Sequence, residues 1–329
     1  MTGDVIMNGD GQAAWRLFRI NWLLIAAVLA VFALCLLVTN FHVRPQGFLI
    51  VYSLAAVYGL VGYYNAVSPR RQNPRIVFSL TALAQLTVIV PTMTAISYIA
   101  ASANLPLVDT KLLALDRALG LDFQIYLNFV NDRLWLIYIL AAGYRAIGLP
   151  ILLIALALPL AGYYQRAGEF IFAFLVSLII TVVVSTFIPA IGVYGVMGLH
   201  ASDFANIVPQ GYYDTLTDAP LLRDGSLRTL DVFALKGVLT FPSFHAVSAV
   251  LYLWAFWPMR WFRPLGLLCS GAMILATPIG GGHFFVDVIA GVAVATASIY
   301  AARRISLMGS PAQSASKNSS NEPGFAGAL

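Results

Sequence analysis

Three residues in the last third of the chain have types and spacing that could do chemistry. His283 and Asp287 are four residues apart at the start of an apolar run, so they share a face if the segment is helical. The carboxylate can then accept the Nδ1 proton of the imidazole and leave Nε2 free as a nucleophile. His245 begins another apolar run. Such a pair of histidines suits phosphoryl transfer, in which one attacks phosphorus and the other protonates the leaving oxygen.

The surroundings of these residues strengthen that hypothesis. Asp287 lies well inside an apolar run, where an ionised side chain costs on the order of 2.5–3.5 kcal/mol on insertion scales, so such residues are functional by default. Gly280–Gly282 precede His283, and we expect their backbone amides to be open to an anion such as phosphate. Ser243 is expected either to cap the helix that carries His245 or to contact a phosphate oxygen.

The elements that position these residues are predicted to be membrane helices. Of the 329 residues, 60% are hydrophobic and 10% are charged, and the mean hydropathy is +0.83, whereas a soluble domain has about 25% charged residues. The net charge of +5 comes from basic residues in short gaps between apolar runs. This pattern indicates membrane topology and argues against a nucleic-acid partner.

The apolar runs are each near the ~20 residues that a helix needs to cross a bilayer. They cover residues 20–40, 47–66, 76–99, 147–164, 170–189, 244–260, 264–282 and 283–302. The first run is longer than the ~7–15 residues of a signal-peptide core, so we expect it to be retained as a span. Segment 131–146 is also apolar, and fits an interfacial helix, a re-entrant helix or the start of the fourth span. The sequence therefore predicts an all-α polytopic transmembrane bundle of about eight spans, within a range of about six to nine.

The basic clusters predict that both termini are cytoplasmic. The clusters are Arg16 and Arg19; Arg70, Arg71 and Arg75; Arg166; Arg260 and Arg263; and Arg303, Arg304 and Lys317. Segments 100–146 and 190–243 then lie outside, and His245 and His283 reach the same outer interface. Short compact loops and a retained first span favour a bacterial inner membrane, with the site on the periplasmic side. Residues 1–19 are expected to form a cytoplasmic arm, residues 20–100 a set of N-terminal membrane helices, and residues 305–329 a disordered tail.

Two segments resemble the signature of the type 2 phosphatidic acid phosphatase superfamily. They read Phe-Pro-Ser-Phe-His-Ala at 241–246 and Gly-Gly-His-Phe-Phe-Val-Asp-Val at 281–288, and they look most like the branch that contains inositol phosphorylceramide synthases. The resemblance is specific over residues 237–300 and weaker over 110–236. It implies a catalytic membrane domain at 101–304, with His283 as the nucleophile that forms a phosphohistidine, Asp287 as its orienting residue and His245 as the general acid.

The sequence departs from the superfamily pattern where phosphate-binding residues are expected. Phe244 replaces the usual Gly before the first histidine, Ala276-Thr277 replace the usual Ser-Arg pair, and no Lys-x6-Arg-Pro element occurs. The cations that bind the phosphate must therefore come from elsewhere on the outer side. Our first candidate is Lys236, followed by Arg228 and Arg223, with Arg145 and Arg117 as further candidates; Ser243 and Gly282 complete the predicted phosphate site.

The predicted reaction acts on a lipid phosphate or a phospholipid headgroup ester. With water as acceptor the protein is a lipid phosphatase, and with an alcohol it is a phosphotransferase, toward which the branch resemblance leans. We expect no cofactor, metal site or disulfide. Two alternatives stay open: a proton-coupled transporter that uses the histidines and the aspartate as a relay, and a non-catalytic lipid-binding protein that has lost its phosphate ligands.

Overall fold

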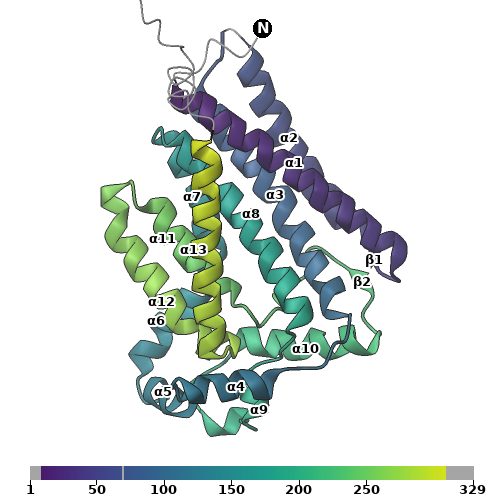
Figure 1. Ribbon diagram of the computed structural model, residues 1–329, viewed down its shortest axis with the longest axis vertical. Coiled ribbons are helices and arrows are strands. Elements are labelled where there is room, and N and C mark those ends of the chain that lie inside the picture. Colours follow the sequence, from purple (N-terminus) through teal and green to yellow (C-terminus); the bar gives the residue numbers. More distant parts are fainter. Residues whose placement is uncertain (1–8, 69, 309–329) are drawn as a thin grey trace, which may run out of the picture.

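The computed structural model describes residues 9–68 and 70–308, and these residues are mainly helical, with two short strands (Figure 1). Six helices are long and apolar enough to cross a membrane. They are α1 (Gly9–Val38), α2 (Pro45–Val67), α3 (Pro74–Ala101), α8 (Tyr164–Phe187), α12 (Arg263–Gly281) and α13 (Phe285–Leu307). The prediction of an all-α polytopic bundle is confirmed. Part of the predicted arm is helical, because α1 begins at Gly9, whereas residues 1–8 and the tail after residue 308 lie outside the described residues.

Two further predicted spans are shorter than expected. Helices α7 (Gly148–Leu160) and α11 (Phe244–Phe256) have 13 residues each, and a helix of this length rises only ~20 Å against the ~30 Å of a bilayer core. Segment 131–146 contains α6 (Leu134–Arg145), which meets α7 at a bend of 57°, as in a broken span or a re-entrant segment. Counting this bent pair as one span gives up to seven candidate spans, within the predicted range.

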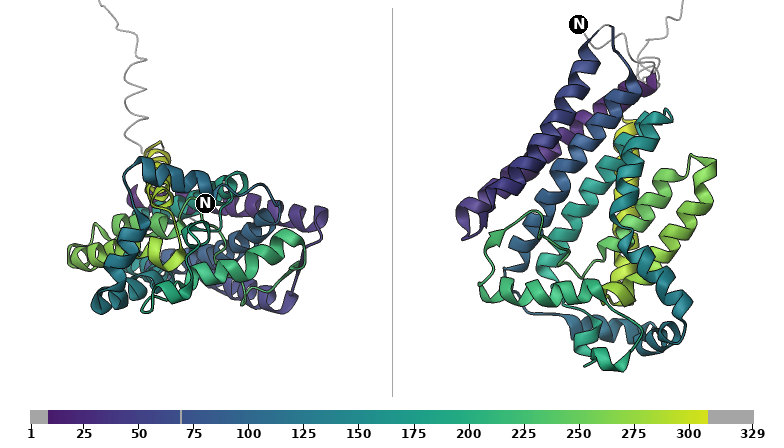
Figure 2. Two further views of the ribbon diagram at one scale, coloured as in Figure 1. Left: turned by 90° about the horizontal axis from the view of Figure 1, so that it is seen from below. Right: turned by 180° about the vertical axis from the view of Figure 1, so that it is seen from behind.

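A layer of short helices covers one end of the bundle (Figures 1 and 2). It consists of α4 (Asp109–Ala118), α5 (Phe123–Asn131), α9 (Val193–Val196), α10 (Gln210–Asp224) and the 3₁₀ helix Ala201–Asp203. Another 3₁₀ turn, Arg260–Phe262, joins α11 to α12 at the opposite end. The strands β1 (His42–Val43) and β2 (Thr229–Leu230) pair in parallel, with His42 opposite Thr229 and Val43 opposite Leu230.

Helix α8 lies at the centre of the molecule and packs against α1, α3, α11 and α13. Its buried residues Phe170 and Phe174 belong to one hydrophobic core together with Phe78 of α3 and Val247 of α11. The N-terminal helices therefore share a core with the helices that carry the candidate catalytic residues. The proposed division at residue 100 separates two parts of the sequence whose helices are packed together.

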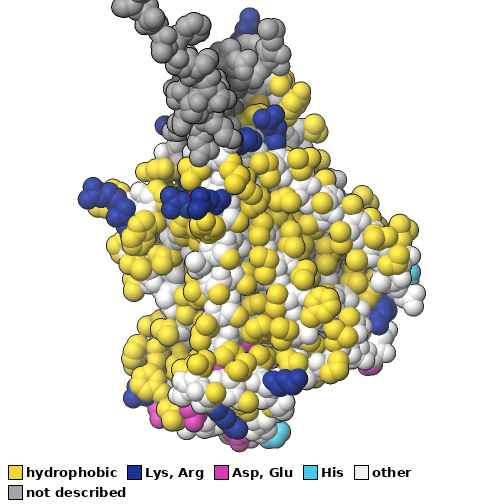
Figure 3. All heavy atoms as spheres, in the orientation of Figure 1, with side chains coloured by type: hydrophobic (Ala, Val, Ile, Leu, Met, Phe, Trp, Pro, Cys, Tyr) yellow, Lys and Arg dark blue, Asp and Glu magenta, His cyan; other side chains and the backbone are white. Residues whose placement is uncertain are grey.

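The charged side chains gather at the two ends of the molecule (Figure 3). Between these ends, the face seen in this view is mostly hydrophobic. Lys and Arg dominate the end where α1 begins and α13 finishes, whereas Asp side chains gather at the end covered by the short helices. Lys and Arg side chains also occur at the covered end, so the two ends differ chiefly in their acidic side chains.

Candidate functional site

His283 lies in a short loop between α12 and α13, at the end covered by the short helices. Its Nδ1 atom lies 3.3 Å from Oδ2 of Asp287, and the same oxygen accepts the backbone N–H of Phe284 at 2.9 Å. Both side chains are buried; Asp287 is 0% exposed. Because α13 begins only at Phe285, the pair forms across the start of the helix rather than along one helical face. The carboxylate thus holds the imidazole and its loop at once.

The chain around His283 is held by helices of the covering layer. The buried carboxylate of Asp116, on α4, accepts the backbone N–H groups of Phe285 and Val286 at 2.8 Å each. Burial raises the pKa of Asp116, and these two hydrogen bonds oppose that rise. On the other side of the loop, Val193 N–H donates to the carbonyl of Gly282 at 2.7 Å. The position of His283 therefore depends on residues that are distant in sequence.

His245 lies in the first turn of α11, which begins beside α13. The Ser243 hydroxyl accepts the Ala246 N–H at 3.4 Å, so Ser243 caps α11, and its side chain is fully buried. The Ser243 N–H donates to the carbonyl of Asp287 at 3.0 Å. A Cβ at Gly291 would collide with the Ser243 carbonyl. A glycine at that position lets the two helix starts, and with them the two histidines, come close together.

Tyr144, near the end of α6, occupies the space beside both histidines. Its ring stacks on the His245 imidazole, with centroids 3.9 Å apart and an angle of 10° between the planes. A Cβ at Gly211, Gly280 or Gly281 would collide with this tyrosine. Gly280 and Gly281 therefore end α12 and make room for Tyr144, which corrects the expectation that they open the next helix as an anion-binding loop. Gly282, at φ +67°, is the left-handed residue that stops α12.

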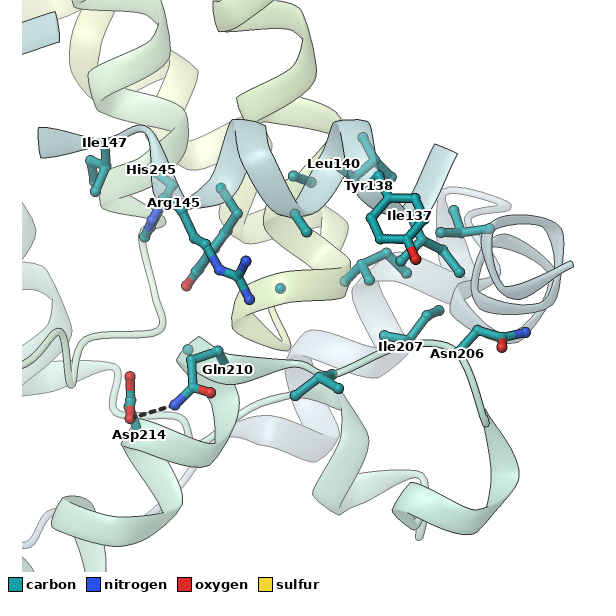
Figure 4. A pocket seen from close by; sticks show the side chains of 18 of the residues that line it. Ile137, Tyr138, Leu140, Arg145, Ile147, Asn206, Ile207, Gln210, Asp214 and His245 are labelled. Carbon is teal, nitrogen blue, oxygen red and sulfur yellow. Dashed lines mark hydrogen bonds between the residues drawn. The ribbon is translucent and has the colours of Figure 1, made fainter. Parts of the chain in front are cut away.

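Two cavities meet at His245. The smaller, of about 220 Å³, is lined by His245 and His283 together with Lys236 and Thr181, whose buried hydroxyl has no hydrogen-bond partner among the described residues. The larger, of about 450 Å³, is lined by His245 and Arg145 but not by His283 (Figure 4). The two cavities share a wall made by Tyr144, Ile147, Gly211, Gly237 and His245. The structure thus brings the two histidines of the sequence hypothesis to one cavity.

The predicted phosphate-binding cations are distributed unequally. Lys236 lines the smaller cavity, and its Nζ lies 2.9 Å from Oδ1 of Asp214, which raises the pKa of the lysine. Arg228 donates to the carbonyls of Leu222 and Leu227 and lies over the ring of Phe41.

Arg223 donates to the carbonyl of Leu105 at 2.9 Å. Neither Arg223 nor Arg228 lines either cavity, because both use their donors to fold the long loop onto its neighbours; Arg117 does not line them either. Arg145 lines the larger cavity, and its guanidinium makes no hydrogen bond or ion pair to any residue within 9–68 or 70–308. The arrangement does not support the predicted roles of Arg223 and Arg228.

Sequence reasoning did not identify Tyr144 or Asp116. Tyr144 is about a hundred residues before the first motif and still farther from the second, and no short pattern marks it. The one available signal was the pair Gly280-Gly281, since glycines inside a helix often mark a close approach by another group. Asp116 carried no sequence signal that we used.

Comparison with known proteins identifies one family. A family model described as the PAP2 superfamily matches residues 110–301, from α4 to α13 and including both histidines and Asp287. Comparisons with curated proteins and with solved structures give no match. The match covers more than half of the chain.

Proposed function

Because this chain belongs to the PAP2 superfamily, we propose that it is a membrane enzyme that transfers the phosphoryl group of a lipid phosphate through a phosphohistidine. Membership of the superfamily supports a phosphatase or phosphotransferase type of function; the lipid substrate and the mechanism are our proposal. The observation that carries it is the convergence of His245 and the Asp287-braced His283 on one cavity.

In the first step, the Nε2 lone pair of His283 attacks phosphorus and the bond from phosphorus to the alcohol oxygen breaks. The leaving oxygen takes that electron pair and a proton from His245. The Asp287 carboxylate accepts a hydrogen bond from Nδ1–H of His283, without taking the proton. It thereby stabilises the imidazole as the ring becomes positively charged. In the second step, His245 removes a proton from the acceptor, whose oxygen attacks phosphorus and releases His283.

We propose that Lys236, Arg145 and the Tyr144 hydroxyl bind the phosphate oxygens. Lys236 lines the smaller cavity, Arg145 lines the larger one, and Tyr144 lies in the wall between them. Two cations would balance the charge that builds on the phosphoryl oxygens in the transition state. In this proposal Ser243 and Gly282 shape the site through the backbone, since the Ser243 hydroxyl is buried as a helix cap and the Gly282 carbonyl accepts a hydrogen bond.

The acceptor is water in a lipid phosphatase and an alcohol in a phosphotransferase; the resemblance to inositol phosphorylceramide synthases favours an alcohol. A proton relay, as in a transporter, would spread its ionisable groups through the depth of the membrane. Here the two histidines gather at one end of the bundle. Superfamily membership likewise favours catalysis over lipid binding without turnover.

We propose that this end faces away from the cytoplasm, in a bacterial inner membrane with both termini inside. The basic residues at the opposite end support this orientation. Cysteine labelling from outside, at Asp132→Cys in the covering layer and at Arg71→Cys at the basic end, measures it. If only the cysteine at position 71 were labelled, the protein would have the opposite orientation in the membrane.

The enzyme is tested with purified protein and radiolabelled lipid phosphates. We expect release of phosphate, and an acid-labile phosphoryl group that mass spectrometry maps to His283. His283→Ala should abolish both, whereas His200→Ala, a change outside both cavities, should alter neither. Turnover by His283→Ala at the wild-type rate, or a phosphoryl group on another residue, would contradict the proposal.

A further inference from the structure

The two cavities that meet at His245 differ in which histidine they reach. The smaller contacts both, whereas the larger contacts His245 and not His283. In phosphoryl transfer the attacking and leaving atoms lie roughly in line on opposite sides of phosphorus. If His283 attacks from the smaller cavity, the alcohol departs on the side away from His283 and next to His245. The larger cavity lies on this side, because it contacts His245 and not His283.

The size of the cavities supports the same division. Ligand pockets for small molecules usually have about 300–1,000 Å³. The larger cavity, about 450 Å³, falls within this range, whereas the smaller, about 220 Å³, falls below it. The smaller cavity suits a phosphoryl group and a few water molecules. The rest of the substrate needs the larger one.

The lining of the larger cavity changes along its length. Figure 4 shows His245, Arg145, Gln210 and Asp214 toward one end and Ile137 and Ile207 toward the other, where Tyr138 and Asn206 also lie. The apolar part of the lining is formed by Val130, Ile137, Leu140, Ile207, Ala276 and Ile279. A ligand that fits this lining is polar at the His245 end and mainly apolar beyond it.

The apolar end adjoins the lipid-facing surface of α6. Tyr138 lines the cavity and is 72% exposed, and its neighbours Trp135 and Ile139 are 64% and 50% exposed. Large exposed apolar side chains of this kind are expected on a surface that contacts lipid. A hydrocarbon chain that leaves the cavity along α6 would reach this exposed apolar surface beside the Tyr138 ring.

We propose that the larger cavity, between α6 and α10, is the subsite for the alcohol half of the substrate, and that this alcohol carries a long hydrocarbon chain lying along α6. This inference rests on the proposed function. The polar end holds the oxygen that His245 protonates, and the chain packs against the apolar end. In the reverse sense, an acceptor alcohol would bring its hydroxyl to the same place.

The test uses two adjacent alanines of α6. Ala141 lines the cavity, whereas Ala142 is exposed and does not line it. Ala141→Trp should fill part of the cavity, Ala141→Leu should fill less, and Ala142→Trp is the matched control. Hexadecyl phosphate and butyl phosphate are the substrates, because their leaving oxygens are chemically alike and only the chain length differs.

We expect Ala141→Trp to lower kcat/KM for hexadecyl phosphate at least about tenfold, the effect of displacing roughly two buried methylene groups, and to change that for butyl phosphate less than about twofold. Ala141→Leu should give a smaller loss in the same direction, and Ala142→Trp should leave both substrates unchanged. If Ala141→Trp does not fold, the leucine variant alone decides.

Three results would overturn the inference. An equal effect of the Ala141 substitutions on both substrates, no effect on either, or the same chain-length effect from Ala142→Trp would each show that the cavity does not select the chain. Each of these leaves phosphoryl transfer by the wild-type protein intact. Loss of the proposed function is recognised separately, by a wild-type protein that releases phosphate from neither substrate.

Discussion

The two histidines of the site are held in different ways. His283 is buried, its Nδ1 lies beside Asp287, and its loop is fixed by hydrogen bonds from α4, α9 and α13. His245 is half-buried and opens onto two cavities, and the group packed on its ring is Tyr144 rather than a carboxylate.

This difference suits two different tasks. A nucleophile gains from a fixed ring and from a carboxylate that stabilises the positive charge formed on attack. A group that first gives and then takes a proton gains from access to both the leaving and the incoming oxygen. The histidine without a carboxylate is the one that can exchange protons with both the leaving and the incoming oxygen.

The largest loss of kcat is expected when His283 loses the carboxylate of Asp287. Asp287→Asn should lower kcat by about 10³–10⁴-fold, by analogy with the loss on replacing the orienting aspartate of a Ser-His-Asp triad. The asparagine keeps the size of the side chain but removes its charge. Stopped-flow measurement of phosphohistidine formation checks this, with Asp132→Asn as an exposed control. A wild-type rate of formation would remove the distinction between the two histidines.

The acid role of His245 predicts an effect that depends on the leaving group. His245→Ala should lower kcat by about 10²–10³-fold for butyl phosphate, whose alkoxide needs a proton, and by less than about tenfold for p-nitrophenyl phosphate. Steady-state assays of both substrates measure the ratio, with His42→Ala as a control outside the two cavities. Equal losses on both substrates would mean that His245 is no proton donor.

Arg145 lies on the His245 side of the site, so its loss should weaken binding of the phosphate oxygens. Arg145→Gln should lower kcat/KM by about 10–100-fold, the range of one or two charge-assisted hydrogen bonds, and Arg145→Lys should recover part of the loss. Arg223→Gln serves as the comparison, because Arg223 is near the end of α10 and does not line either cavity. If Arg223→Gln folded normally and lowered kcat/KM more than Arg145→Gln, the phosphate would be bound by Arg223, as predicted from the sequence, rather than by Arg145.

Tyr144 gives the smallest and most diagnostic effect. Tyr144→Phe keeps the ring on His245 and removes only the hydroxyl, so we expect a loss of kcat of about three- to tenfold, as for one neutral hydrogen bond. Tyr144→Leu removes the stacking as well and should cost more, and Tyr138→Phe controls for a hydroxyl at the cavity mouth. Wild-type kcat in Tyr144→Phe, combined with a loss in Tyr144→Leu, would reduce the tyrosine to a packing role.

Short-range patterns in the sequence predicted the helical fold class, and they singled out two histidines that the structure brings to one cavity. A continuous apolar run of about 20 residues spans a bilayer as a helix, which pairs all its backbone groups within the segment. The spacing of His283 and Asp287 places them within reach of each other. Patterns could not show that α7 and α11 are too short to span alone, since the flanking residues are also apolar.

The phosphate-binding residues were harder to predict because they depend on contacts between distant segments. Arg223 and Arg228 were chosen for their closeness in sequence to His245, yet their donors bind carbonyl groups of the loop and of the chain after α3. Arg145 was a lower candidate, and what favours it is the bend between α6 and α7, which no local pattern specifies. The superfamily resemblance was confirmed, whereas the synthase-like branch stays a prediction.

The paired strands β1 and β2 connect the first helical hairpin, α1 and α2, to the segment that leads to Lys236. Besides their paired residues, Arg44 forms a 2.7 Å ion pair with Asp231, and Gly47 lies so close to Val232 that a Cβ would collide with it. A shortened protein that kept only residues 110–301 would lack β1 and would therefore lose this strand pairing. The segment before α11 would then lose the contacts that hold it against the first helical hairpin. The activity of such a fragment would be lower than the activity of the full chain.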